Sequence, residues 1–253
     1  MKNNKSLGQH WLKDRNILDE IALLSIEDGV NLCLEIGPGL GTLTSSLFKR
    51  FNKILAVELD ENLAKNLPKS FPGKNLAVEN IDFLNFDLEK IKEPYVISGN
   101  IPYYITSPII QKILHANNKP RRVVLLIQKE VAERIAAKKG QTLISLIVQN
   151  MSIVELGSVV PRDLFSPPPK VDSQVIIFSP REKPIIGEDV FKIIKDGFTA
   201  PRKKLITNLS SNGKINRELL KKCFSNLGIS LDCRPSDLSL QDWQNLKNAI
   251  DNM

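Results

Sequence analysis

The sequence has few of the residues that build metal clusters and disulfide frameworks. Its 253 residues include three cysteines, Cys33, Cys223 and Cys233, and only two histidines. No two cysteines have the CxxC spacing, and a structural zinc site needs four ligands brought together. We therefore expect no metal site. Cys33 lies in the apolar run 32–36 and is expected to be a small buried hydrophobic residue.

Long hydrophobic runs are also lacking. No apolar stretch approaches the roughly 20 residues of a membrane span. Residues 1–16 are polar and basic, without the apolar centre of a signal peptide. The expectation is a cytoplasmic protein with no membrane segment.

The composition is that of a globular protein with an excess of positive charge. Hydrophobic residues make up 42% and charged residues 25%, which argues against disorder. Lysine and arginine outnumber aspartate and glutamate by 35 to 28, for a net charge of +7. This charge favours a polyanion such as nucleic acid as the partner, although a merely basic surface would give the same balance.

Short apolar runs alternate with amphipathic stretches over the first 180 residues. Such alternation predicts an α/β fold with a mainly parallel sheet and helices on both faces, in which ligands bind beyond the carboxyl ends of the strands. The expected strands are 31–36, 53–57, 76–78, 95–98, 123–127 and 175–178. The expected helices are 40–49, 61–67, 108–114, 129–137 and 143–151.

The pattern changes after residue 178. Residues 179–184 read as a linker, and the segments 190–198, 201–209, 217–227 and 240–248 have helical periodicity. We therefore predict two domains, an α/β domain over 1–180 and a small all-α domain over 181–253.

A glycine-rich turn follows the first expected strand. Residues 35–41 read E-I-G-P-G-L-G, and glycines such as Gly37 and Gly39 let the backbone turn sharply and approach a ligand closely. The dinucleotide pattern G-x-G-x-x-G would need a third glycine at position 42, where Thr42 stands. The observed E-x-G-x-G-x-G spacing is typical of class I methyltransferases. The alternative is a tight strand-to-helix turn without a ligand.

Acidic residues follow the next two strands. Glu58 ends the second and could accept both hydroxyl hydrogens of a ribose diol. Asp82 follows the third and could accept a hydrogen bond from an adenine amine, while the apolar Phe83 packs on the ring. Either acid alone would suit a solvated loop. Three successive strand ends of the right kind favour a nucleoside-containing cofactor.

Residues 100–103, N-I-P-Y, follow the fourth strand and resemble the catalytic motif of amino-methyltransferases. An adenine amine is a poor nucleophile because its lone pair is delocalised into the ring. The Asn100 side chain and a backbone carbonyl of 101–102 could each accept one amine hydrogen and aim the lone pair at a methyl donor. Pro102 stiffens the turn, and Tyr103 offers a face for an extruded base. The alternative is a buried turn.

The N-[LI]-P-Y form of this motif resembles that of the ribosomal RNA adenine dimethyltransferase family, and the resemblance covers nearly the whole chain. Residues 7–12, 128–131 and 165–172 are similar to three further motifs of that family. The resemblance implies S-adenosylmethionine as cofactor, a Rossmann-like class I methyltransferase fold, and cofactor contacts by His10 and Leu12. One departure is Tyr104, at a position where many relatives have asparagine.

The resemblance also assigns residues that meet RNA. Phe165 would flank the target base opposite Tyr103 or, alternatively, fill the core beneath a proline-rich loop. Lys170 would meet phosphate. Arg202, Lys203 and Lys204, expected at the start of a helix, suit phosphate contacts that position the protein without reading sequence, or form a solvated basic face.

Two branches of the family share these motifs. The segments 169–173 and 198–209 resemble the branch that dimethylates two adjacent adenines near the 3′ end of small-subunit ribosomal RNA during subunit maturation. The expected partner is that RNA within a pre-30S particle, and the protein is expected to bind it as a monomer. The alternatives are a large-subunit RNA methyltransferase that gives macrolide resistance, a DNA adenine methyltransferase, and a ribosome assembly factor without activity.

Overall fold

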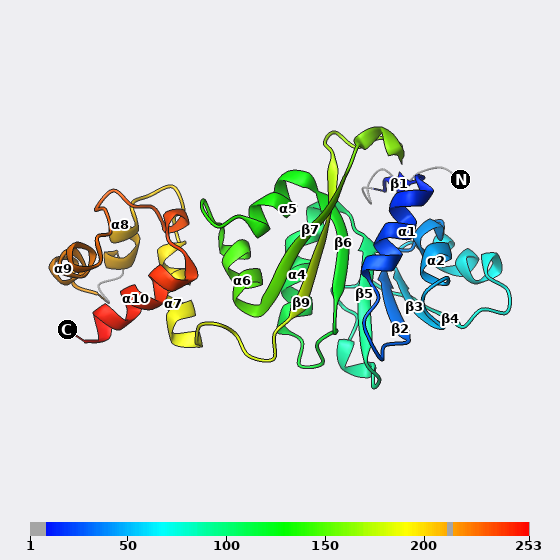
Figure 1. Ribbon diagram of the computed structural model, residues 1–253, viewed down its shortest axis with the longest axis horizontal. Coiled ribbons are helices and arrows are strands. Elements are labelled where there is room, and N and C mark those ends of the chain that lie inside the picture. The colour runs from blue at the N-terminus through cyan, green and yellow to red at the C-terminus, as the bar shows by residue number, and fades with distance from the viewer. Residues whose placement is uncertain (1–8, 212–214, 253) are drawn as a thin grey trace. The chain divides into compact units, whose positions relative to one another are not determined.

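The computed structural model describes residues 9–211 and 215–252, so Leu7 and Gly8 of the N-terminal motif lie outside the described residues. The chain forms two compact units (Figure 1). The first contains residues up to 133 and 152–180, and the second contains 134–151 and the residues after 180. The predicted boundary at 180 and 181 coincides with one of these divisions. Residues 134–151, predicted to lie in the first domain, instead group with the C-terminal helices.

A seven-stranded sheet forms the centre of the first unit, with the strand order β4-β3-β2-β5-β6-β9-β7 (Figure 1). The first five strands in this order, from β4 through to β6, are parallel to one another. Strand β9 is antiparallel to both β6 and β7. Strand β2 is buried along its whole length and β6 at every residue except Gln128, because helices cover parallel sheets. The strands are β2 (Leu32–Ile36), β3 (Lys53–Glu58), β4 (Leu76–Asn80), β5 (Tyr95–Asn100), β6 (Val123–Gln128), β7 (Ser152–Val160) and β9 (Ser173–Pro180).

The predicted α/β fold class is confirmed, and all six expected strands are present. Strand β7 was not predicted. It lies at the edge of the sheet, carries Gly157 in its interior, and has a shift in its pairing with β9 between Leu156 and Val159. These features interrupt the alternation of apolar and polar residues by which a strand is identified.

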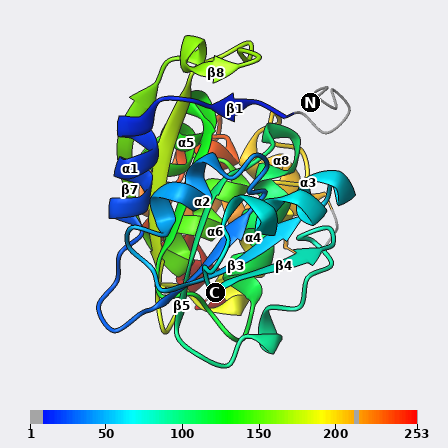
Figure 2. The ribbon, with the colours of Figure 1, turned by 90° about the vertical axis from the view of Figure 1, so that its right-hand side faces the viewer.

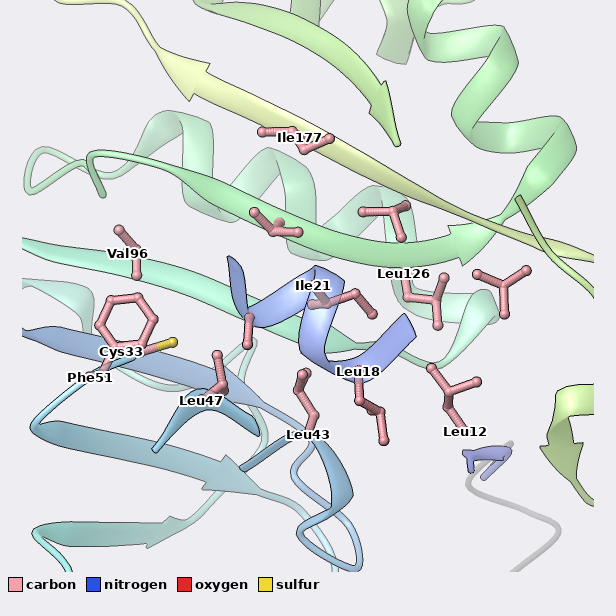
Figure 3. Close-up of a cluster of buried hydrophobic side chains, with 14 of the residues drawn as sticks. Leu12, Leu18, Ile21, Cys33, Leu43, Leu47, Phe51, Val96, Leu126 and Ile177 are labelled. Atoms are coloured by element: carbon pink, nitrogen blue, oxygen red, sulfur yellow. The ribbon is translucent and has the colours of Figure 1, made fainter. Parts of the chain in front are cut away.

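Helices α1 (Arg15–Leu24) and α2 (Thr42–Leu47) cover one face of the sheet. Leu18 and Ile21 of α1 and Leu43 of α2 pack over the strands beside Cys33, as Figure 3 shows. All four side chains are at most 3% exposed, so the predicted burial of Cys33 is confirmed. Burying each leucine or isoleucine contributes about 1.5–3 kcal/mol to folding. The remaining helices of this unit are α3 (Glu61–Asn66), α4 (Thr106–His115) and the beginning of α5 (Lys129–Ala136).

The second unit is helical and has its own core, centred on Trp243 and Phe224. Asn150 fastens the segment before the C-terminal helices, since its Oδ1 accepts the backbone N–H of Ile186 at 2.8 Å. Ser239 and Asp242 form a reciprocal cap at the start of the last helix. The helices are α6 (Leu143–Met151), α7 (Glu188–Gly197), α8 (Leu205–Ser210), α9 (Arg217–Leu227) and α10 (Leu240–Asp251). Across the described part of the chain, every helix is too short or too polar to span a membrane.

Candidate functional site

The carboxyl ends of β2, β3, β4 and β5 meet at one pocket. This is the edge at which open parallel sheets bind ligands. The N-terminal segment also reaches the pocket, because the short strands β1 (Trp11–Leu12) and β8 (Phe165–Ser166) pair antiparallel (Figure 2). Ten of the predicted site residues line this pocket: His10, Leu12, Gly37, Gly39, Glu58, Asp82, Phe83, Asn100, Pro102 and Tyr103.

The glycine loop depends on backbone conformations that other residues rarely adopt. Gly37 and Gly39 have φ values of +65° and +58°. A Cβ at Gly39 would lie 3.2 Å from the indole nitrogen of Trp11. The N–H of Gly37 donates to the carbonyl of Val57 at 2.9 Å, which ties the loop to the neighbouring strand. The loop therefore forms a tightly held wall of the pocket.

Glu58 is a buried carboxylate in that wall. Its side chain is 6% exposed and accepts the N–H groups of Gly39 at 3.0 Å and Asp60 at 2.9 Å. Burial raises the pKa of Glu58, and these two N–H donors oppose the rise. The carboxylate is thus fixed in position at the pocket, where it can accept further hydrogen bonds.

Asp82, just after the end of β4, lines the same pocket. One of its carboxylate oxygens accepts the N–H of Leu84 at 2.9 Å and so orients the side chain. Phe83 is 4% exposed and lines the same part of the pocket. Two apolar residues that were not predicted, Leu59 and Ile81, also line it while remaining 49% and 36% exposed. Leu59 follows Glu58 and Ile81 precedes Asp82 in the sequence. This adjacency is the signal that could have identified them.

Asn100 is the last residue of β5, and only one end of its amide is engaged. Its Nδ2 donates to the backbone carbonyl of His10 at 2.9 Å. Its Oδ1 accepts no hydrogen bond from any residue that the structure describes. Because the nitrogen is held, the oxygen has a defined direction and remains available to a ligand in the pocket.

Tyr103 is held next to Asn100 by contacts at both ends of its side chain. Its hydroxyl hydrogen-bonds to Ser173 Oγ at 2.6 Å, and its ring lies 6.0 Å from the His10 ring at an interplanar angle of 21°. His10 in turn is hydrogen-bonded through Nδ1 to the carbonyl of Pro167 at 2.8 Å. Burial raises the pKa of Tyr103, so its hydroxyl stays protonated near neutral pH.

Phe165 takes the second of its two predicted roles. It is 4% exposed, belongs to the core cluster with Leu12 and Leu18, and is absent from the pocket lining. Its pairing with Leu12 across β1 and β8 turns the ring into the core. The role of flanking a target base is therefore not supported by this arrangement.

The basic residues predicted to meet RNA lie on exposed segments. Lys170 is exposed in the loop between β8 and β9, where its carbonyl accepts a hydrogen bond from Arg162 at 3.3 Å. Arg202 and Lys203 are exposed in the turn before α8, and Lys204 is the residue that precedes its first turn. The expected helix 201–209 is thus shorter, because Lys204 has an extended backbone with ψ of 139°. Lys204 is paired with Asp232.

Comparison with known proteins decides the family. The sequence profile of the family described as ribosomal RNA adenine dimethylase matches residues 1–252. The chain belongs to this family. The Ribosomal RNA small subunit methyltransferase A of Acaryochloris marina is 38% identical, and the match covers 97% of this chain and 96% of that relative. The protein of the same name from Trichormus variabilis is 39% identical, with 99% and 98% covered.

Two solved structures agree with this membership. The 23S rRNA methyltransferase ErmE is 27% identical, with a TM-score of 0.78 over 95% of this chain and 99% of that chain. A dimethyladenosine transferase from Plasmodium falciparum is 26% identical, with a TM-score of 0.77 over 93% and 95%. The predicted class I methyltransferase fold, enzyme class and S-adenosylmethionine cofactor are confirmed at the level of the family.

The pocket of this family member fits S-adenosylmethionine. The buried Glu58 carboxylate suits a ribose diol, and Asp82 suits an adenine amine. The half-exposed Leu59 and Ile81 can pack on the faces of an adenine ring. A close approach to the glycine loop is possible because Gly39 has no Cβ. We propose that these residues hold the nucleoside part, while His10 and Leu12 lie toward the methionine part.

Glu35, the first residue of the glycine motif, is buried beneath the loop and does not line the pocket. It is 1% exposed, and its Oε2 accepts the Thr44 hydroxyl at 2.6 Å. Its Oε1 has no hydrogen-bond partner among the described residues, and neither has the hydroxyl of Ser98, its registered neighbour on β5. Burial raises the pKa of Glu35 to about 8. The carboxyl therefore keeps its proton to a higher pH than an exposed glutamate does.

Glu35→Gln is expected to flatten the pH dependence of stability. The folded-state pKa of about 8 lies above the usual value of 4.5, so the folded protein binds a proton that the unfolded chain has lost between these pH values. Wild-type stability therefore falls as the pH rises through this window, whereas the uncharged variant lacks this contribution. We expect the variant to gain about 1 kcal/mol or more relative to wild type between pH 5 and 8, measured by urea unfolding. Glu61→Gln, on the exposed start of α3, is the control, and parallel profiles for wild type and Glu35→Gln would contradict the prediction.

Proposed function

We propose that this protein transfers methyl groups from S-adenosylmethionine to the exocyclic amines of two adjacent adenines near the 3′ end of small-subunit ribosomal RNA. It would act as a monomer in the cytoplasm, on a pre-30S particle during subunit maturation. The observation that carries the proposal is the Asn100 amide at the pocket, whose nitrogen is held by the His10 carbonyl and whose oxygen has no hydrogen-bond partner among the described residues. The identity of 38–39% to small-subunit relatives over nearly the whole chain favours this substrate over large-subunit RNA.

The chain's own residues account for activation of the amine. Asn100 Oδ1 accepts one amine hydrogen, and a carbonyl of the Ile101–Pro102 segment accepts the other. This geometry favours a pyramidal nitrogen whose lone pair points along the pocket. S-adenosylmethionine supplies an electrophilic methyl group on a sulfonium centre. Tyr103 stacks on the extruded adenine, and the amine proton leaves to solvent once the new N–C bond has made it acidic. The rate enhancement comes from positioning and fixed dipoles rather than from a general base.

The test is methyl transfer to defined ribosomal particles. The protein is incubated with labelled S-adenosylmethionine and small subunits from cells that lack the modification, and the digested RNA is analysed by mass spectrometry. Dimethyladenosine from two neighbouring positions supports the proposal. Label in large-subunit RNA instead would assign the chain to the resistance branch. No label in either RNA would overturn the enzymatic function and favour an assembly factor.

Reversing the charge of the exposed turn before α8 is expected to weaken particle binding. The side chains of Arg202 and Lys203 have no ion-pair partner in the part of the chain that the structure describes, so both are available to phosphate. Arg202→Glu or Lys203→Glu should lower affinity for small subunits about tenfold at low salt and should not steepen the salt dependence, since fewer counterions are released. Lys222→Glu on α9 is the control for net charge. Equal affinities across a salt titration would remove these residues from the RNA contact.

A further inference from the structure

Tyr104 is the most exposed large hydrophobic side chain that the structure describes, at 61%. Its hydroxyl makes no hydrogen bond to any described residue, and Tyr104 has no role in the proposed transfer reaction. A tyrosine buries a large area when it packs, so an unpacked one next to a reaction centre points to a ligand. Tyr104 also lines the same pocket as Asn100.

The turn that carries Tyr104 is rigid. Pro102 precedes the 3-10 turn Tyr103–Ile105, and the N–H of Ile105 donates back to the Pro102 carbonyl at 3.3 Å. The Thr106 hydroxyl donates to the carbonyl of Tyr103 at 3.1 Å. The aromatic ring of Tyr104 is thus presented from a braced backbone, which lowers the entropy lost when a ligand packs on it.

The two consecutive tyrosines have opposite surroundings. Tyr103 is partly buried and anchored by its hydroxyl to Ser173, whereas Tyr104 extends into solvent from the next position in the chain. Side chains of neighbouring residues in a 3-10 turn point in different directions. They therefore offer two separate aromatic surfaces, one inside the pocket and one at its mouth.

We propose that Tyr104 stacks on the base of the nucleotide adjacent to the target adenine. The inference rests on the proposed function, because it requires a single-stranded RNA substrate with one base extruded into the pocket. Extrusion removes the target from its stack and leaves a face of the neighbouring base uncovered. An aromatic ring at the mouth restores that stacking in a sequence-tolerant way, since every base has a π face. Where two adenines are adjacent, one of them would occupy the Tyr104 surface while the other is methylated.

The cofactor is the less suitable occupant of this surface. The acids and glycines that fit the nucleoside come from the ends of β2, β3 and β4, where the apolar Leu59 and Ile81 already line the wall. Tyr104 comes from the turn after β5 that carries the amine-binding Asn100. An RNA contact predicts a change in RNA affinity alone, whereas a cofactor contact predicts a change in S-adenosylmethionine affinity.

The experiment compares Tyr104→Ala and Tyr104→Phe with wild type on unmodified small ribosomal subunits. The control is Leu23→Ala, which removes an apolar side chain that is 52% exposed on α1. We expect Tyr104→Ala to raise the KM for subunits about 5- to 100-fold with the Kd for S-adenosylmethionine within twofold of wild type. Tyr104→Phe keeps the ring and should behave like wild type.

A second substrate locates the contact. Subunits in which uridine replaces one of the two adjacent adenines leave a single target beside a weaker stacking base, so the difference between wild type and Tyr104→Ala should shrink on them. An unchanged subunit KM for Tyr104→Ala, an equal effect on both substrates, or weakened cofactor binding would each overturn the inference while wild type remains active. Absence of transfer by the wild-type protein would overturn the proposed function and the inference with it.

Discussion

Replacing Asn100 by alanine is expected to lower kcat for methyl transfer by about 100- to 1000-fold. The expected loss is the size found when one preorganised hydrogen-bonding group is removed from a reaction centre, about 2.7–4 kcal/mol. The side-chain oxygen of Asn100 would accept an amine hydrogen at the moment the nitrogen attacks, and alanine has no acceptor. The fold should survive, because this amide makes one hydrogen bond to the described residues, to the His10 carbonyl. The measurement is single-turnover transfer to unmodified small subunits at saturating S-adenosylmethionine.

Asn80→Ala provides the matched control for Asn100→Ala. Asn80 also ends a strand, β4, and its Nδ2 donates to the carbonyls of Glu58 at 2.8 Å and Leu59 at 3.2 Å. These contacts support the cofactor wall, so its removal should raise the Kd for S-adenosylmethionine several-fold and leave kcat within about threefold. If Asn100→Ala retained kcat within fivefold of wild type, Asn100 would be a structural residue and not a catalytic one.

Four of the residues that the sequence identified share one property, which is a position at or just after the end of a strand. Gly37, Glu58, Asp82 and Asn100 each follow a short apolar run, and parallel strands bring such positions to one edge of a sheet. Local pattern was therefore sufficient to assemble this part of the pocket. Their contacts with cofactor and RNA remain predictions.

Other parts of the site depend on contacts between distant segments, which no local pattern contains. Trp11 enters the pocket because β1 pairs with β8, more than 150 residues later in the chain, and the same pairing turns Phe165 into the core. Residues 134–151 have the same helical pattern whichever unit they join. Contacts with the C-terminal helices, such as the burial of Leu146 in their core, assign them.

The strand that carries Asn100 was predicted too short for a reason that bears on stability. The expected strand ended at Ser98, because Gly99 weakens a strand pattern, yet β5 continues to Asn100. Gly99 is registered with Ile36 of β2 and Leu125 of β6. A glycine inside a central strand marks a place where another group approaches closely. That group here is the backbone of β2 just before the glycine loop.

Gly99→Ala is consequently expected to destabilise the protein by about 2–4 kcal/mol. The added Cβ would lie 2.7 Å from the carbonyl oxygen of Ile36 and 3.2 Å from its Cβ, and a strand backbone inside a sheet cannot move aside as a side-chain tip can. Relief of this contact requires β2 and β5 to separate at the point where both enter the pocket, so S-adenosylmethionine affinity should fall together with stability. Urea unfolding and calorimetric titration of the cofactor measure the two effects.

Gly187→Ala tests whether this effect comes from backbone contact or from loss of glycine as such. Gly187 has a φ of −74°, which alanine adopts freely, and the atom nearest its added Cβ is the mobile carboxylate oxygen of Asp189. That oxygen can rotate away, so Gly187→Ala should cost no more than the loss of an N-terminal capping residue, about 1 kcal/mol or less. Equal destabilisation by both substitutions would contradict this explanation. The close approach of Gly99 to Ile36 would then not be the reason why β5 has no side chain at that position. If Gly99→Ala alone destabilised the protein, the position of Asn100 would depend on a glycine that allows two neighbouring strands to meet beneath the pocket.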